Sequence, residues 1–329
     1  MNNKNIFKGE KAIFDYLTPG ATGPTPLIEL PSRLNPFLKD GVHIYIKLVQ
    51  SVPLANIKSI PAWHMLSAIP KKELTKIENL VEYSSGNSAL SLAILSRHFG
   101  IPKMHAIITP SVPKNKQNLL RLLGTDLIIS DGPSCPDPCS DVGGAWDARQ
   151  MGKKSGWRNL NQYMNYDGPE GEGKTIGGEL LKQFGKKLNI VCISIGTGST
   201  VLGTGSYLKK KIPKLFVIAN SIKNGSSIPG PREQKNVSKL YFPWQKVVDL
   251  EIPVAEKPAY EMSLKLIREG IFVGPSTGMQ LAGILEFLEK SKKEKMLKKN
   301  TTIALIACDT MFPYIEEYFT VLPEILEKK

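Results

Sequence analysis

The sequence predicts an α/β protein with parallel β-sheet, and three features of the chain support this prediction. Short runs rich in β-branched residues recur throughout the 329 residues. These runs are nearly continuous in apolar character, which is typical of parallel strands buried on both faces. Segments with helical spacing of apolar residues separate the runs, so strands and helices alternate along the whole chain.

Each apolar run predicts one strand. In chain order the predicted strands cover residues 43–48, 79–84, 105–110, 126–131, 189–196, 215–220 and 303–308. The intervening helical patterns cover residues 88–99, 114–123, 175–184, 203–211, 260–268 and 277–290. Two irregular stretches, 132–144 and 221–243, are rich in Gly, Pro and polar residues. Long loops in α/β proteins gather at the strand ends where ligands bind, so these stretches indicate a functional edge.

The composition excludes several other classes of protein. Lys and Arg number 43 against 30 Asp and Glu, which gives a net charge of +13. These cations form separate lysine-rich patches without interleaved aromatic residues, so we interpret them as a solvated surface and expect no nucleic-acid partner. No apolar run approaches the roughly 20 residues of a membrane span, and the N-terminal residues lack a signal-peptide pattern. We therefore expect a soluble, cytoplasmic protein that does not bind membranes.

The four cysteines are too few for a disulfide scaffold. Cys192 and Cys308 lie in apolar runs and are predicted to be buried. Cys135 and Cys139 form the sequence CPDPC within the first irregular stretch. Because no His or second Cys pair lies nearby to complete a tetrahedral set, we interpret this segment as a loop and predict no metal site.

A glycine-rich turn follows the predicted strand 189–196. It consists of Gly196, Thr197, Gly198, Ser199 and Thr200. Small residues let the backbone N–H groups approach an anion, and the following helix N-terminus adds positive potential. The pattern is not a Walker A loop, and a phosphate monoester suits it better than a pyrophosphate. A plain strand-to-helix turn is the alternative.

A second small-residue turn follows the strand 79–84. It consists of Ser84, Ser85, Gly86, Asn87 and Ser88. Its position before a helix predicts a carboxylate-binding nest. Because a single residue would suffice to cap the helix, we favour an anion site over an elaborate N-cap.

Lys58 is a candidate nucleophile within the segment PLANIKSIPAWHML. Its neighbours are mostly apolar, and partial burial would favour the neutral amine that a Schiff base requires. The alternative is an ordinary solvated lysine, since the chain contains 43 Lys and Arg residues.

In this order, from Thr25 to about Tyr314, these segments resemble the cysteine synthase/cystathionine β-synthase family of fold type II pyridoxal-phosphate enzymes. Residues 23–27 (GPTPL) are similar to the family's GNTPL, and residues 269–278 (EGIFVGPSTG) to its EGLLVGPSSG. The turn at 84–88 looks like TSGNT, and the turn at 196–200 looks like GTGGT.

The resemblance implies pyridoxal 5′-phosphate (PLP) as the cofactor. It implies that Lys58 is the Schiff-base lysine, that Asn87 contacts the 3′ oxygen, and that residues 196–200 hold the phosphate. Thr310 follows Asp309 at the position of the family's Asp-Ser pair, so its hydroxyl is expected at the pyridine nitrogen.

The resemblance also implies the reaction. Residues 84–88 and Gln162 would bind the carboxylate of an amino-acid substrate. We expect β-replacement on an activated serine, such as O-acetylserine, with sulfide as the nucleophile, via an aminoacrylate intermediate. The alternatives are another PLP lyase on this scaffold (a serine/threonine dehydratase, a cysteine desulfhydrase, or a diaminopropionate- or cystathionine-forming enzyme) and a non-catalytic scaffold that binds PLP or a partner protein.

The sequence departs from the family pattern at several positions. Ser59-Ile60 replaces the usual Asp-Arg after the lysine, and Asn56 replaces a serine before it. Ser199 replaces a glycine, and residues 236–238 (NVS) replace a Gly-Ile-Gly near the amino-acid site. The last of these changes, at residues 236–238, bears on the identity of the substrate.

The family architecture implies two α/β domains with the cofactor between them. We expect a larger, phosphate-binding domain from residues 1–46 and 159–329. A smaller, carboxylate-binding domain is expected from residues 47–158. A homodimer is expected by analogy.

Overall fold

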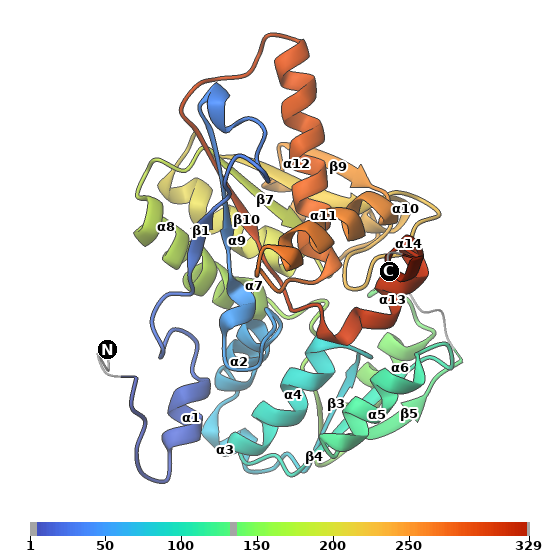
Figure 1. Cartoon of the computed structure of the whole chain (residues 1–329). Coiled ribbons are helices and arrows are strands. Elements are labelled where there is room, and N and C mark those ends of the chain that lie inside the picture. Colours follow the sequence, from blue (N-terminus) through green and yellow to red (C-terminus); the bar gives the residue numbers. More distant parts are fainter. Residues whose placement is uncertain (1–4, 132–136, 328–329) are drawn as a thin grey trace.

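A computed structural model describes residues 5–131 and 137–327, which form two β-sheets flanked by helices (Figure 1). The larger sheet has the strand order β1-β2-β10-β7-β8-β9, and the smaller sheet has the order β5-β4-β3-β6. All neighbouring strands are parallel except β1 and β2. The predicted α/β fold with mostly parallel sheets is therefore confirmed.

The seven predicted strands all form, and three further strands join them at sheet edges. The larger sheet consists of β1 (Leu27–Glu29), β2 (Val42–Lys47), β7 (Ile190–Ser194), β8 (Phe216–Ile222), β9 (Leu250–Val254) and β10 (Thr301–Ile306). The smaller sheet consists of β3 (Asn79–Tyr83), β4 (Lys103–Ile108), β5 (Asp126–Ile129) and β6 (Trp157–Asn159). Strands β1, β6 and β9 escaped prediction because they are short or half-exposed edge strands without a continuous apolar run.

The predicted helices also form, several with changed boundaries; the helix expected from residue 260 begins at residue 256, and the one expected over 277–290 covers 275–293. The helix expected from residue 203 begins at residue 199, and the one expected from 175 begins with a π-helical turn (Gly173–Gly177). The helices are α1 (Ala12–Leu17), α2 (Ser59–Ser67), α3 (Lys71–Leu74), α4 (Asn87–His98), α5 (Lys114–Leu122), α6 (Gly144–Met151), α7 (Asp167–Glu172), α8 (Gly178–Phe184), α9 (Ser199–Lys211), α10 (Gln234–Val237), α11 (Glu256–Arg268), α12 (Pro275–Lys293), α13 (Ile315–Val321) and α14 (Glu324–Glu327).

The larger sheet is buried on both faces, which explains its continuous apolar strands. Along β7, Ile190 and Cys192 pack on the face covered by α11 and α12. Val191 and Ile193 point the other way, into the cluster that contains residues of α8 and α9. Figure 1 shows α8 and α9 on the side of the sheet opposite α11 and α12. Successive side chains of a strand alternate between faces, so a strand covered on both sides must be apolar throughout.

Helices α7 and α9 approach each other closely enough to require glycine. A Cβ atom at Gly203 would overlap the carbonyl oxygen of Pro169 in α7. A Cβ at Gly173 would lie 2.7 Å from the Gly203 carbonyl oxygen. This close contact brings the end of α7 against the first turn of α9.

The strands of the smaller sheet all come from residues 79–159, and those of the larger sheet come from the chain on either side. Leu17 of α1 packs with Ala62 and Leu66 of α2 in a cluster that includes residues of the smaller sheet. The division into residues 47–158 and the flanking segments stays a prediction.

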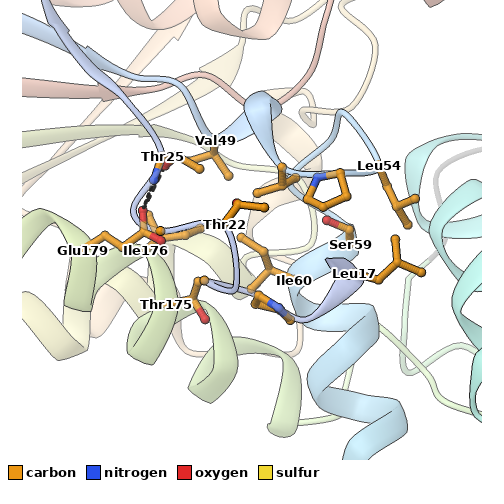
Figure 2. Close-up of a pocket in the computed structure, with 15 residues that line it drawn as sticks. Leu17, Thr22, Thr25, Val49, Leu54, Ser59, Ile60, Thr175, Ile176 and Glu179 are labelled. Atoms are coloured by element: carbon orange, nitrogen blue, oxygen red, sulfur yellow. Dashed lines mark hydrogen bonds between the residues drawn. The ribbon is translucent and has the colours of Figure 1, made fainter. Parts of the chain in front are cut away.

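The segment after α1 packs between α2 and α8 and lines a small pocket. Thr22, Ser59, Ile60 and Glu179 are among the residues that line it (Figure 2). Both Thr25 Oγ1 and the Thr25 backbone nitrogen donate to the Glu179 carboxylate, each at 2.9 Å. The N-terminal segment is thus hydrogen-bonded to α8.

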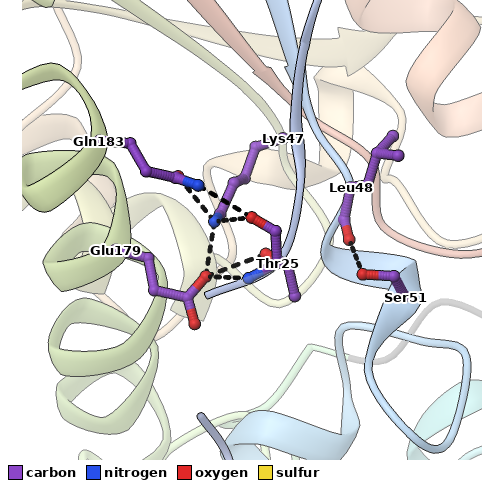
Figure 3. A network of polar contacts seen from close by, with 6 residues as sticks. All are labelled: Thr25, Lys47, Leu48, Ser51, Glu179 and Gln183. Carbon is purple, nitrogen blue, oxygen red and sulfur yellow. Dashed lines mark hydrogen bonds and ion pairs between the residues drawn. The ribbon is translucent and has the colours of Figure 1, made fainter. Parts of the chain in front are cut away.

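A fully buried lysine completes this junction. Lys47 Nζ lies 2.5 Å from Glu179 Oε2 and donates to Thr25 O at 2.7 Å and to Gln183 Oε1 at 2.8 Å (Figure 3). Burial lowers the pKa of Lys47, and the Glu179 carboxylate opposes this shift. The ion pair therefore ties β2, α8 and the N-terminal segment together in a buried environment.

Candidate active site

A cavity of about 450 Å³ opens between the two sheets, at the carboxyl ends of their strands. Tyr83 and Ile108 line it from the ends of β3 and β4, and Ser194 lines it from the end of β7. The carboxyl ends of parallel strands are the usual ligand site of an α/β protein.

The cavity collects nearly all of the predicted site residues. Residues that line it are Lys58, Ser84, Ser85, Gly86, Asn87, Ser88, Gln162, Gly196, Thr197, Gly198 and Thr200. Ser199 lines only a small adjoining pocket beside Lys58, and Thr310 lines neither. Separate turns of the sequence therefore meet at one site.

Lys58 is held at the start of α2 by backbone and side-chain contacts. The Ile57 N–H donates to the Cys308 carbonyl at 2.7 Å, just beyond β10. The buried Asn56 side chain accepts a hydrogen bond from Ser91 Oγ of α4 at 3.0 Å. The departure at Asn56 thus connects the lysine segment to α4.

The departure at Ser59-Ile60 does not alter the wall of the main cavity. Both residues are buried; Ser59 Oγ donates to the Asn56 carbonyl at 2.8 Å, and Ile60 joins the apolar core of the larger sheet. Neither residue lines the main cavity.

The glycine-rich turn has the backbone of an anion site. Gly198 has φ +86°, the left-handed region that favours glycine, and α9 begins at the next residue. The first N–H groups of a helix have no partner within it and remain available to an anion. Arg232 places positive charge beside this turn. Its Nε donates to the Gly196 carbonyl at 3.1 Å, and its guanidinium lies over the Tyr163 ring.

Arg232 was not predicted as a site residue. It lies in the irregular stretch 221–243, and residues 229–232 line the cavity. Residues 236–238, where the family pattern changes, do not line it. Val237 of α10 instead packs into the core, and its carbonyl accepts a hydrogen bond from Trp244 Nε1 at 3.1 Å.

The serine-rich turn combines helix capping with an exposed polar face. Ser84 Oγ accepts hydrogen bonds from the Gly86 and Ala89 N–H groups, at 3.3 and 3.4 Å. Ser88 Oγ donates to Gln162 Oε1 at 2.5 Å, so two residues predicted to bind a carboxylate are in direct contact. The turn therefore caps α4 and lines the cavity, while its binding of a carboxylate stays a prediction.

Asn87 contacts an acidic residue that the sequence did not single out as a site residue. Its Nδ2 donates to Asp309 Oδ2 at 2.7 Å, and the Tyr314 hydroxyl donates to the same oxygen at 2.5 Å. Burial raises the pKa of Asp309 to about 6, while these two hydrogen bonds oppose the rise. Asp309 lines the cavity and joins α4 to the segment after β10.

Ser276 lines the cavity, whereas Thr310, the residue expected at the pyridine nitrogen, does not. Ser276 lies in the first turn of α12, and its buried Oγ has no hydrogen-bond partner within residues 5–131 and 137–327. The expected contact of Thr310 with the cofactor stays a prediction.

A buried hydroxyl without a hydrogen-bond partner is available to an acceptor atom of a ligand. A pyridine nitrogen is an acceptor of this kind. The glycine-rich turn 196–200, called the phosphate turn below for its predicted role, lies on one cavity with Lys58 and Ser276. The residues present therefore fit PLP.

The three cysteines within the described residues are not grouped into a site. Cys192 is buried as predicted; Cys308 is only half-buried and lines the cavity, because it follows β10 at the sheet edge. Cys139 is exposed, and Cys135 lies outside the described residues.

Comparison with known proteins identifies the family. The family model described as pyridoxal-phosphate-dependent enzyme matches residues 19–309. The chain belongs to this family. PLP as the cofactor, and a fold type II enzyme of the cysteine synthase type, are therefore confirmed.

Curated relatives and solved structures agree. Cysteine synthase from Staphylococcus aureus is 27% identical over 295 residues, covering 86% of this chain and 90% of the relative. Cysteine synthase B from Escherichia coli is 25% identical over 312 residues, covering 91% and 96%.

The structure of O-ureido-L-serine synthase is similar in fold to this PLP enzyme, with a TM-score of 0.76 at 24% identity, covering 90% of this chain and 92% of that one. A hydrogen sulfide-producing enzyme from Fusobacterium nucleatum has a TM-score of 0.73 at 24% identity, covering 87% and 93%. No helix in the described part of the PLP enzyme has the length and apolarity to cross a membrane.

Proposed function

We propose that this PLP enzyme catalyses β-replacement on an activated serine, such as O-acetylserine, with sulfide, and so forms cysteine or a relative. The observation that carries the proposal is the shared cavity of Lys58, the phosphate turn and the Ser88–Gln162 pair. These groups suit an amino acid held by its carboxylate beside a lysine amine. The cysteine synthase relatives from two bacteria support the same reaction.

In this proposal the chain supplies binding, orientation and proton transfer. PLP, when bound, supplies an electron sink for loss of the α-proton and the β-substituent. Lys58 Nζ would hold the cofactor covalently and, when its amine is free, would accept the α-proton of the substrate. The 84–88 turn and Gln162 orient the carboxylate, while Ser276 Oγ takes the role at the pyridine nitrogen first assigned to Thr310. Thr197, Thr200 and the N-terminus of α9 hold the phosphate.

The proposal is tested first by substitution of Lys58 and then by a comparison of substrates. Lys58→Ala is expected to abolish the visible absorption of the Schiff base and to reduce turnover by at least a thousandfold. Lys174→Ala, at an exposed lysine paired with Glu170, is the matched control and leaves both unchanged. An unchanged spectrum and rate in Lys58→Ala would overturn the assignment.

The substrate comparison separates the proposed reaction from its alternatives. O-acetylserine and sulfide together are expected to give cysteine, with neither sufficient alone. Release of a keto acid without a nucleophile would indicate a PLP lyase such as a dehydratase or desulfhydrase. Absence of any spectral change with amino acids would indicate a non-catalytic scaffold. The expected homodimer is checked by the mass of the holoenzyme in solution.

A further inference from the structure

A buried carboxyl group lies directly behind the phosphate turn. Glu172, the last residue of α7, has no exposed surface. Its Oε1 accepts a hydrogen bond from Thr200 Oγ1 at 2.6 Å, and its Oε2 accepts one from Ser199 Oγ. Both hydroxyls belong to the turn expected to hold the cofactor phosphate.

The two hydroxyls differ in where they lie. Thr200 lines the main cavity, whereas Ser199 is almost fully enclosed and lines only the small pocket beside Lys58. Glu172 therefore contacts one hydroxyl beside the anion site and one behind it. The close packing of α7 on α9 at Gly203 holds the carboxyl group there.

The direction of these hydrogen bonds depends on the charge of Glu172. A hydroxyl has one proton to donate, so an ionised Glu172 takes the protons of both Ser199 and Thr200. Thr200 then presents only oxygen lone pairs to the cavity. A protonated Glu172 can donate one hydrogen bond itself, which frees the Thr200 proton for a phosphate oxygen.

Charged and titratable groups reach this carboxyl group from α2 and α9 as well as from its own segment. Lys58 at the start of α2 is the cation that acts on Glu172. His64 of α2 and Tyr207 of α9 pack against the glycines on either side of Glu172. Burial raises the pKa of Glu172, and Lys58 and the two hydroxyls oppose the rise.

We propose that Glu172 is a positioning residue for the cofactor phosphate, whose carboxyl group sets the donor direction of the Thr200 hydroxyl so that phosphate binding takes up a proton. The inference rests on the proposed phosphate-binding role of residues 196–200. A dianionic phosphate and an ionised Glu172 compete for the same hydroxyl proton. Protonation of Glu172 resolves that competition.

The test measures phosphate binding rather than turnover. Pyridoxine 5′-phosphate, which has no aldehyde and cannot react with Lys58, is titrated into the full-length protein freed of PLP. Tryptophan fluorescence reports binding from pH 5.5 to 9.0, because Trp244 lies beside Gly198. The phosphate group of the ligand titrates in the same way with every variant. The ratio of the Kd values of two variants at each pH therefore reports the contribution of Glu172 to binding.

Above the pH at which Glu172 is half-ionised, the wild-type protein is expected to bind pyridoxine 5′-phosphate more weakly relative to Glu172→Gln. The affinity ratio is expected to fall by up to tenfold per pH unit. Calorimetry in buffers of different ionisation enthalpy is expected to show proton uptake in the wild type that Glu172→Gln lacks. Ser199→Ala, which removes one hydrogen bond to the ionised carboxylate, is expected to move the wild-type midpoint to higher pH. This second variant keeps the test decisive if Glu172→Gln does not fold.

Glu170→Gln is the matched control, because Glu170 is an exposed glutamate of the same helix. It is expected to keep the wild-type pH profile. A ratio of wild-type to Glu172→Gln Kd values that does not change with pH, together with an unmoved midpoint in Ser199→Ala, overturns the role of Glu172. It leaves the phosphate site itself standing. Absence of binding by the wild type at any pH overturns the phosphate site and this inference together, whereas failure of the sulfide reaction with binding intact leaves the inference standing.

Discussion

The buried ion pair of Lys47 and Glu179 offers a sharp test of how this fold is held together. Glu179→Gln removes the carboxylate but keeps an acceptor for the two hydrogen bonds from Thr25. The fully enclosed Lys47 ammonium is then left with neutral acceptors, the Thr25 carbonyl and Gln183 Oε1. Breaking a buried pair from one side costs about 3–5 kcal/mol, so a loss of that size in the free energy of unfolding is expected at pH 7.

The pH dependence of this loss has a definite sign. Burial lowers the pKa of Lys47 below its ordinary value of 10.5, and Glu179 partly restores it. Without Glu179 the folded-state pKa falls further, so the unfolded chain binds more protons than the folded chain over a wider alkaline range. Stability therefore rises with pH in that range, and the deficit of Glu179→Gln is expected to shrink between pH 7 and 9.5.

Urea unfolding followed by circular dichroism measures these free energies. The double variant Lys47→Met/Glu179→Gln removes both charges and is expected to be about 2 kcal/mol more stable than the sum of the single losses predicts. A deficit below about 1 kcal/mol at pH 7, typical of a surface pair, would refute the reasoning. So would a deficit that grows with pH.

Three further predictions concern packing, charge and the site. Gly203→Ala is expected to destabilise the protein by about 3 kcal/mol in urea unfolding through overlap with α7, whereas Gly178→Ala, whose Cβ in α8 would make only a van der Waals contact with Tyr207 Oη at 3.8 Å, is expected to stabilise it by up to about 1 kcal/mol; equal effects would contradict the packing argument. Burial raises the pKa of Glu82 to about 7 from 4.5. The folded wild type therefore loses stability as pH rises from 4.5 to 7, because its unfolded chain ionises Glu82 first. Over this range the free energy of unfolding of Glu82→Gln is expected to rise by roughly 3 kcal/mol relative to that of the wild type. A constant difference across that range, measured by the same unfolding assay, would rule out a buried charge. Ser276→Ala is expected to leave the melting temperature of the cofactor-free protein unchanged but to reduce turnover at least tenfold, while Thr310→Val does not. The reverse order of activities would restore the original assignment of Thr310.

Local patterns determined most of the secondary structure and the chemistry of the chain. Continuous apolar runs predicted seven strands, all but β5 in the interior of a sheet, because a parallel strand covered on both faces must be apolar throughout. The turns at 84–88 and 196–200 were predicted as anion sites because small residues at a helix N-terminus carry that function locally. The order of these segments, with Lys58 before them, also predicted the family and its cofactor.

Only the tertiary structure decided which side chains meet. Asn87 and Asp309 are separated by 222 residues yet share a hydrogen bond, and no local pattern encodes such a contact. Ser276 lines the cavity and Thr310 does not, because α12 places its first turn beside the segment that follows β10. Glu172 lies behind the phosphate turn because glycine allows α7 and α9 to touch. These placements depend on packing between distant elements, whereas strands, helices and turns depend on residues close together in the chain.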